Sequence, residues 1–184
     1  VLELREIETP TPSGGQVLVK ISAVSVNPLD WHVLRGEPFL VRVMGFGLFK
    51  PKQQILGADF SGWVEAIGEG VTQFKVGDEV FGSALGCFAE YSCVNESRVV
   101  LKPASVTFEQ GASAGVAGLT ALQGLRDACH RQAGQKVLIH GASGVVGTFA
   151  VQIAKSMGAQ VTGVCSGRNV EMVRMIGADY VIDY

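Results

Sequence analysis

The chain has 184 residues, enough for one large domain or two small ones. A formal net charge of −2 and a sequence pI of about 5.9 argue against a nucleic-acid-binding surface as the main function. No apolar run approaches the length of a membrane span, so the composition predicts a globular protein without a nucleic-acid partner.

The cysteines are scattered along the chain and form no C-x-x-C pair. A zinc site needs clustered ligands, and isolated thiols do not indicate a disulfide framework. We therefore interpret the four residues as reduced thiols and predict a cytoplasmic location. They are Cys87, Cys93, Cys129 and Cys165.

The first half of the chain, residues 1–107, has mainly strand-like patterns. The segment from Gln16 to Val26 alternates well enough to predict one long strand. After Asn27 the chain leaves this strand, and Pro28 stands where the first residue of a short helix is expected.

The segment 38–54 combines two Gly and two Pro with a strongly apolar centre. It is too broken for a regular core helix and too apolar for an ordinary solvated loop. Two interpretations remain open: a loop packed against the core, or the apolar wall or lid of a substrate pocket.

Between Leu56 and Val94 the chain is rich in glycine and turn signals. Strands are expected in the segment 56–71, at 79–81 and within 86–94. Short strands and many turns predict a compact β-barrel-type module.

A helical segment links the two halves. Residues 108–126 are rich in small residues at helical spacing, with Thr107 as the expected N-cap and Gln110 at the capping-box position. Several glycines weaken this helix unless another group must approach its backbone closely. We place the domain boundary here, with domains at 1–107 and 108–184.

The segment Lys136–Gly147 reads Lys-Val-Leu-Ile-His-Gly-Ala-Ser-Gly-Val-Val-Gly. A buried strand, a glycine-rich turn and a helix N-terminus in this order form a phosphate site, because unpaired N–H groups and the helix dipole attract negative charge. The spacing departs from G-x-G-x-x-G, and a tight turn between strand and helix is the simpler alternative.

The elements that follow favour the phosphate site. A helix is expected over Thr148–Met157, a strand over Gln160–Cys165, a helix over Asn169–Ile176 and a strand over Tyr180–Asp183. This βαβαβ order is the mononucleotide-binding half of a Rossmann doubly wound fold. Because the chain begins with Val1 and ends after this strand, we expect a fragment that is truncated at both ends and incomplete as an enzyme.

The end of the second strand of this half selects the cofactor. An acid at this place holds the ribose of NAD, but the chain instead has Ser166 and Arg168. A hydroxyl and a guanidinium suit the 2′-phosphate of NADPH. The alternative is that Ser166 only caps the next helix and Arg168 is solvated.

With these segments laid out, the chain resembles the medium-chain dehydrogenase/reductase superfamily over its whole length. The motifs that carry the resemblance are Leu56-Gly-x-Asp-x-x-Gly-x-Val, Gly77-Asp78-x-Val80 and Gly141-Ala-Ser-Gly-x-Val-Gly147. Within the superfamily it is most similar to the zinc-free quinone oxidoreductase branch. The resemblance implies a GroES-like β-barrel-type domain followed by the first βαβαβ half of a Rossmann domain.

The resemblance also implies that both metal sites of the zinc-dependent members are missing. Those members have a ligating Cys, a His and a Glu where this chain has Asn27, Ala58 and Asp59. Alanine cannot ligate and an amide oxygen is a poor Zn²⁺ ligand, so we expect no metal.

Site residues follow from the resemblance position by position. Catalytic roles fall to Asn27, which would donate to a developing enolate or quinol oxygen, and to Asp30 or His32 as proton relays. The residues expected to hold the pyrophosphate of NADPH are Ser143, Gly144, Val145, Val146 and Gly147. The adenosine 2′-phosphate is expected near Ser166, Arg168 and Tyr184, and the nicotinamide near Thr120.

We therefore expect a zinc-independent, NADPH-dependent oxidoreductase that transfers hydride to a quinone or an α,β-unsaturated carbonyl, with a homodimeric full-length parent. The alternative is a nucleotide-binding regulatory or scaffold protein with weak turnover, in which the apolar residues 39–49 contact a partner or a membrane surface. A zinc-dependent alcohol dehydrogenase is a third, disfavoured possibility.

Overall fold

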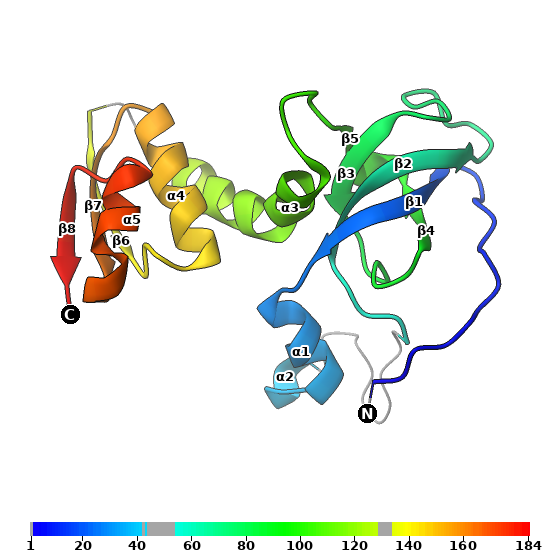
Figure 1. Ribbon diagram of the computed structural model, residues 1–184, viewed down its shortest axis with the longest axis horizontal. Helices are drawn as coiled ribbons and strands as arrows, with labels where there is room; N and C mark the ends of the chain where they lie inside the picture. Colours follow the sequence, from blue (N-terminus) through cyan, green and yellow to red (C-terminus); the bar gives the residue numbers. More distant parts are fainter. Residues whose placement is uncertain (1, 42, 44–53, 129–133) are drawn as a thin grey trace. The chain divides into compact units, whose positions relative to one another are not determined.

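A computed structural model describes residues 2–41, 43, 54–128 and 134–184 (Figure 1). The chain divides into two compact units, Val1–Val116 (unit 1) and Ala117–Tyr184 (unit 2). Among the described residues, no helix combines the length and apolarity needed to cross a membrane.

Unit 1 is built on an antiparallel sheet with the strand order β4-β1-β2-β3-β5. Within the described residues this order does not close on itself, so the module predicted as β-barrel-type is an open sheet and not a closed barrel. Its strands are β1 (Gln16–Ser25), β2 (Asp59–Ile67), β3 (Glu79–Ser83), β4 (Tyr91–Asn95) and β5 (Val99–Leu101).

The core of unit 1 follows from β-branched and aromatic residues that alternate along these strands. One residue of each strand illustrates it: Val19, Phe60, Val80, Val94 and Val99 are all buried in one cluster. The single long strand predicted from residue 16 is confirmed as β1, whereas β5 was not expected because three residues carry no readable alternation.

Helix α1 (Pro28–Arg35) begins directly after β1, with Pro28 in its first turn as expected. The helical turn α2 (Phe39–Val41) follows, and the side chains of Phe39 and Leu40 are exposed. The rest of the predicted pocket wall or lid falls mainly on residues 42 and 44–53, which lie outside the described residues.

Helix α3 (Phe108–Gln123) begins in unit 1 and ends in unit 2, where the π-helical turn η3 (Gly124–Ala128) extends it. The predicted capping box is confirmed. The Gln110 N–H donates to Thr107 Oγ1 at 3.2 Å, and the Thr107 N–H donates to Gln110 Oε1 at 3.0 Å. The Gln110 N–H, one of the orphan donors of the helix, is thus satisfied by the side chain of the N-cap residue.

Unit 2 has a parallel sheet with the order β6-β7-β8, formed by β6 (Lys136–His140), β7 (Gln160–Cys165) and β8 (Tyr180–Asp183). The crossovers contain α4 (Val145–Ser156), and η4 (Gly167–Asn169) with α5 (Val170–Met175). This is the βαβαβ arrangement expected for the start of a Rossmann domain. The bounds of β7 and β8 agree with those predicted.

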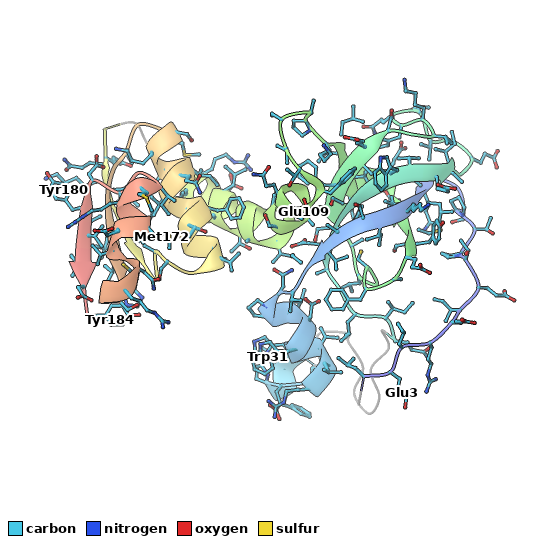
Figure 2. All side chains as sticks on the ribbon, viewed as in Figure 1. Glu3, Trp31, Glu109, Met172, Tyr180 and Tyr184 are labelled. Atoms are coloured by element: carbon cyan, nitrogen blue, oxygen red, sulfur yellow. The ribbon has the colours of Figure 1, made fainter. Side chains whose placement is uncertain are left out.

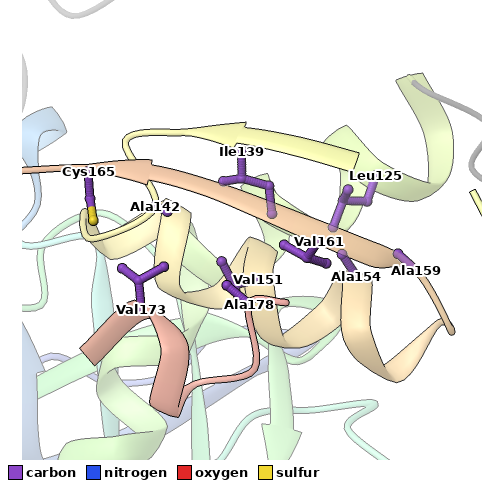
Figure 3. Close-up of a cluster of buried hydrophobic side chains, with 10 residues drawn as sticks. All are labelled: Leu125, Ile139, Ala142, Val151, Ala154, Ala159, Val161, Cys165, Val173 and Ala178. Atoms are coloured by element: carbon purple, nitrogen blue, oxygen red, sulfur yellow. The ribbon is translucent and has the colours of Figure 1, made fainter. Parts of the chain in front are cut away.

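Helices α4 and α5 pack on one face of this sheet, where they bury the core of unit 2 (Figure 3). Val161 and Cys165 of β7 point toward Val151 of α4 and Val173 of α5. Gly163 faces the same way: a Cβ there would lie 2.6 Å from Val173 Cγ1. The absence of a side chain at this position lets α5 pack closely against the strand.

Candidate cofactor and substrate sites

The glycine-rich turn between β6 and α4 leaves helix N–H groups available to a ligand. The Gly144 N–H donates to the Gly141 carbonyl at 2.9 Å, and the Thr148 N–H donates to the Gly144 carbonyl at 2.8 Å. The N–H groups of Val145, Val146 and Gly147 lie between these two and have no carbonyl inside the helix to bond. They form an anion-binding helix terminus of the kind that pyrophosphate fits.

Two glycines of this turn have different surroundings. A Cβ on Gly147 would lie 2.1 Å from the Gly141 carbonyl oxygen, so this glycine holds the turn against the helix. A Cβ on Gly144 would meet only that same oxygen, at 3.3 Å, and otherwise open space. The side chain of Val145 is 60% exposed and does not fill the turn. The turn therefore has room for a phosphate against its backbone.

A second set of groups lies where β7 ends. Asn169 Nδ2 donates to Ser143 Oγ at 3.2 Å and to Ser166 Oγ at 3.0 Å. One amide thus joins the glycine-rich turn to the loop after β7, which are 26 residues apart in sequence. Ser166 occupies the N-cap position of η4, but its side chain makes no capping hydrogen bond there. The exposure of Arg168 agrees with the alternative of a solvated side chain, so the 2′-phosphate role of both residues stays a prediction.

The loop after β7 also has one positively and one negatively charged side chain in or beside it, those of Arg168 and Asp183. Arg168 is exposed and forms no ion pair or hydrogen bond with any described residue. The carboxylate of Asp183, at the end of β8, approaches Gly167 so closely that a Cβ on this glycine would lie 2.8 Å from Asp183 Oδ2. The loop therefore presents one free cation and one nearby carboxylate.

Tyr184 follows β8 at the end opposite Tyr180 (Figure 2). Its ring is stacked on that of His140, the last residue of β6, with centroids 6.1 Å apart and an interplanar angle of 9°. Thr120 is exposed on the part of α3 that belongs to unit 2. Its predicted nicotinamide role stays a prediction.

Unit 1 contains a buried polar cluster around Asp59, the first residue of β2. This carboxylate is 0% exposed and accepts the Val116 N–H at 3.0 and 2.9 Å on its two oxygens. It also accepts Asn27 Nδ2 at 3.1 Å and Ser25 Oγ at 3.3 Å. A buried carboxylate is stable only with such partners, so the cluster ties α3 to the ends of β1 and β2.

The same cluster engages the side-chain amide of Asn27 in hydrogen bonds. Its Nδ2 donates to Ser25 Oγ at 3.1 Å as well as to Asp59 Oδ2, so both amide hydrogens are engaged. Donation to a substrate oxygen, as predicted from the resemblance, requires that one of these hydrogen bonds be exchanged.

Asp30 and His32 make contacts that support the structure of α1. The Asp30 carboxylate accepts the Asn27 N–H at 2.7 Å and the Gly57 N–H at 3.2 Å. His32 stacks on Trp31 with centroids 4.0 Å apart, and its Nδ1 bonds the Glu37 carbonyl at 2.5 Å. No hydrogen bond of the described residues joins His32 to Asn27 or Asp30, and the proton-relay roles stay predictions.

No group of three or more His, Cys, Asp or Glu able to hold a metal ion occurs among the residues that the structure describes. Cys87 is fully buried, and desolvation by this burial raises the pKa of its thiol to about 12, although its hydrogen bonds with Ser92 and with the Ala84 carbonyl, to which its Sγ donates, act in the opposite direction. Such a thiol is a packing residue and a poor ligand or nucleophile.

Comparison with known proteins identifies the family. The family described as "Alcohol dehydrogenase GroES-like domain" matches residues 13–104. The chain belongs to this family. Its relatives are quinone oxidoreductases of the medium-chain dehydrogenase/reductase superfamily, as the sequence motifs indicated.

One such relative is the chloroplast envelope quinone oxidoreductase homolog of Arabidopsis thaliana, 39% identical over 194 residues, which cover 100% of this chain and 56% of that protein. Among solved structures, the quinone oxidoreductase from Coxiella burnetii matches with a TM-score of 0.86 and 36% identity, over 100% of this chain and 58% of that one. The Escherichia coli quinone oxidoreductase complexed with NADPH matches with a TM-score of 0.83 and 28% identity, over 98% and 53%. The chain thus spans about half the length of these proteins.

Sequence reasoning missed two residues of these sites. Asn169 was assigned only to the start of a helix, and Asp59 only to a lost metal site. For Asp59 a signal was present, because an acid inside the apolar run Ala58–Phe60 must find buried partners. For Asn169 the short Ser-x-x-Asn spacing after a strand offers only a weak turn signal.

Proposed function

We propose that unit 2 binds NADPH and that the whole protein is a metal-independent reductase, which delivers hydride to a quinone or an α,β-unsaturated carbonyl. The observation that carries the proposal is the loop after β7, which holds Ser166 and an Arg168 guanidinium without a partner among the described residues, and has no acid at the end of that strand. Asn169 of this loop bonds both Ser166 and Ser143, and Ser143 belongs to the turn that leads into the helix terminus formed by Val145–Gly147. Relatives named quinone oxidoreductases, one complexed with NADPH, support the reaction class.

The residues present fit the cofactor in two respects. The N–H groups of Val145 and Val146 suit a diphosphate, and the open space at Gly144 leaves its backbone accessible. The Arg168 guanidinium suits a phosphate monoester, because it forms charge-assisted hydrogen bonds and lacks a protein partner among the described residues. When bound, NADPH supplies the hydride.

Metal independence is supported by the chemistry of unit 1. The carboxylate of Asp59 is committed to three neutral donors, and Ala58 beside it offers no ligand atom. We propose that Asn27 orients a carbonyl or quinone oxygen while an apolar environment keeps water away from the hydride transfer. We also propose that the full-length protein forms a homodimer.

The cofactor assignment is tested by titrating the chain with NADPH and NADH. Arg168→Ala is expected to weaken NADPH binding about tenfold or more, the size of one charge-assisted hydrogen bond, and to leave NADH within about twofold. Arg174→Ala is the matched control, because it removes an exposed arginine of the same unit from α5. Equal losses for both cofactors in Arg168→Ala would remove the 2′-phosphate assignment.

The reaction is tested separately in a preparation that binds NADPH. Quinones, enals and enones are offered, and oxidation of the reduced nicotinamide is followed by absorbance. We expect turnover with at least one class, reduced at least about tenfold by Asn27→Ala. Turnover that survives unchanged in Asn27→Ala removes this residue from the reaction, and no turnover with any acceptor contradicts the reductase proposal.

A further inference from the structure

The amide of Asn169 is the strongest unassigned feature of the candidate cofactor site. Its Nδ2 lies 3.2 Å from Ser143 Oγ and 3.0 Å from Ser166 Oγ, and both serines come from the segments proposed to hold the phosphates. The residue is half-buried at the end of η4, and its own N–H donates to the Ser166 carbonyl at 2.8 Å. Backbone and side chain together fix its position in the loop.

The direction of these hydrogen bonds has a chemical consequence. A serine hydroxyl carries one donor and two acceptor sites. Because Asn169 donates to both oxygens, it occupies an acceptor site on each hydroxyl and leaves both O–H groups to donate elsewhere. A phosphate offers only acceptors at its oxygens, so two hydroxyls held as donors are complementary to it.

Charge alone is a weak discriminator at this loop. Arg168 adds one positive charge, but the Asp183 carboxylate lies against Gly167, the residue beside it. The carboxylate offsets part of the attraction of the guanidinium for an additional phosphate. Preference for a 2′-phosphate over a 2′-hydroxyl must then depend on oriented donors as well as on charge.

We propose that Asn169 is a positioning residue for cofactor selection, which orients the hydroxyls of Ser143 and Ser166 as donors to the pyrophosphate and the 2′-phosphate of NADPH. This inference rests on the proposed binding of NADPH by unit 2. Ser143 would donate to the pyrophosphate, which NADPH and NADH share, and so contribute to the affinity for both cofactors. Ser166 would donate to the 2′-phosphate and so contribute only to the preference for NADPH.

The test reverses the hydrogen bonds with little change of shape. In Asn169→Asp the side chain accepts only, so both hydroxyls donate to it and present lone pairs to the phosphates. Dissociation constants for NADPH and NADH are measured by fluorescence titration for the wild-type chain, Asn169→Asp, Ser166→Ala and the double variant. Thermal midpoints of the unliganded proteins verify folding.

We expect Asn169→Asp to reduce the preference for NADPH over NADH about tenfold or more, and to weaken NADH by a smaller factor. The negative charge that Asn169→Asp adds acts on the cofactor whether or not Ser166 is present. The reversal of the hydroxyl from donor to acceptor of the 2′-phosphate requires Ser166. In the Ser166→Ala background the substitution should therefore change the preference much less, by about twofold. Asn95→Asp is the matched control: it makes the same change in unit 1, where the amide caps η2 (Glu96–Arg98) through Ser97.

The outcomes separate this inference from the proposal beneath it. If the wild-type chain prefers NADPH and Arg168→Ala removes that preference, the proposed function holds. If Asn169→Asp then keeps the wild-type preference, or loses it equally with and without Ser166, the positioning role is wrong. A wild-type chain that binds neither cofactor, or both equally, overturns the proposed function and this inference with it.

Discussion

Gly115 of α3 lies against the buried carboxylate of unit 1, so adding one methyl group there should destabilise the protein. A Cβ at this position would lie 2.2 Å from Asp59 Oδ1 and 2.8 Å from Asp59 Cγ. Ordinary carbon–oxygen contacts are about 3.3 Å, so the carboxylate or the helix must move by about 1 Å. In an unconstrained helix the same substitution stabilises by up to about 1 kcal/mol.

The size of the loss follows from the hydrogen bonds at stake. A displacement of about 1 Å lengthens the 2.9 Å bond from the Val116 N–H to Asp59 beyond hydrogen-bonding range, and the bond from Asn27 at 3.1 Å likewise. Each hydrogen bond to a charged group contributes about 1.5–3 kcal/mol, and a buried carboxylate that loses partners keeps its desolvation penalty. We expect Gly115→Ala to lower the free energy of unfolding by about 3 kcal/mol.

Urea unfolding followed by tryptophan fluorescence measures this loss, because both tryptophans of the chain, Trp31 and Trp63, belong to unit 1. Trp63 also packs on Phe108 at the start of α3, with centroids 4.4 Å apart. The control is Gly124→Ala in η3, where a Cβ would meet nothing within 4 Å. The urea unfolding of this control is measured by far-UV circular dichroism. A Gly115→Ala protein as stable as the wild type would refute the reasoning.

Two further predictions concern unit 1. The pKa of Cys87 rises from 9.0 to about 12 on folding, chiefly by desolvation, so the unfolded chain loses this proton first. The free energy of unfolding should therefore fall as pH rises from about 9 to about 12, by up to about 1.4 kcal/mol per pH unit, and urea midpoints of Cys87→Ala should show a flatter slope. Lys102, whose side chain is 5% exposed, pairs with Glu79 at 2.9 Å and donates to the Val106 carbonyl at 2.6 Å. Lys102→Met should lower the free energy of unfolding by about 1–3 kcal/mol in urea titrations, and exposed Lys75→Met by less than about 0.5; similar values for both would contradict this role.

Elements with a local cause were predictable from the sequence. The capping box of Thr107 and Gln110, the end of the helix predicted to reach Met157 and the bounds of β7 all depend on residues a few positions apart. The family motifs extended this to the order of the two domains. The three-residue strand β5 was not predicted, because its pairing with β3 is decided by the tertiary fold and not by its own sequence pattern.

The side-chain networks of the sites were not predictable, because their partners are far apart in sequence. Asp59 bonds Asn27 and Val116, which are 32 and 57 residues away, and Asn169 bonds Ser143 across 26 residues. Which of these groups meet depends on strand register, and a shift of one residue in β2 would turn Asp59 to the other face of the sheet.

The Asp59 cluster links stability to chemistry. One carboxylate fixes both the backbone of α3 at Val116 and the amide of Asn27, so a substitution that moves it alters helix and amide together. Gly115→Ala should for that reason impair the proposed reduction even where enough folded protein remains, since the Asn27 amide loses the partner that orients it. Impaired turnover in folded Gly115→Ala, with NADPH affinity kept, would support the role of Asn27; normal turnover would show that the amide orientation does not matter for the reaction.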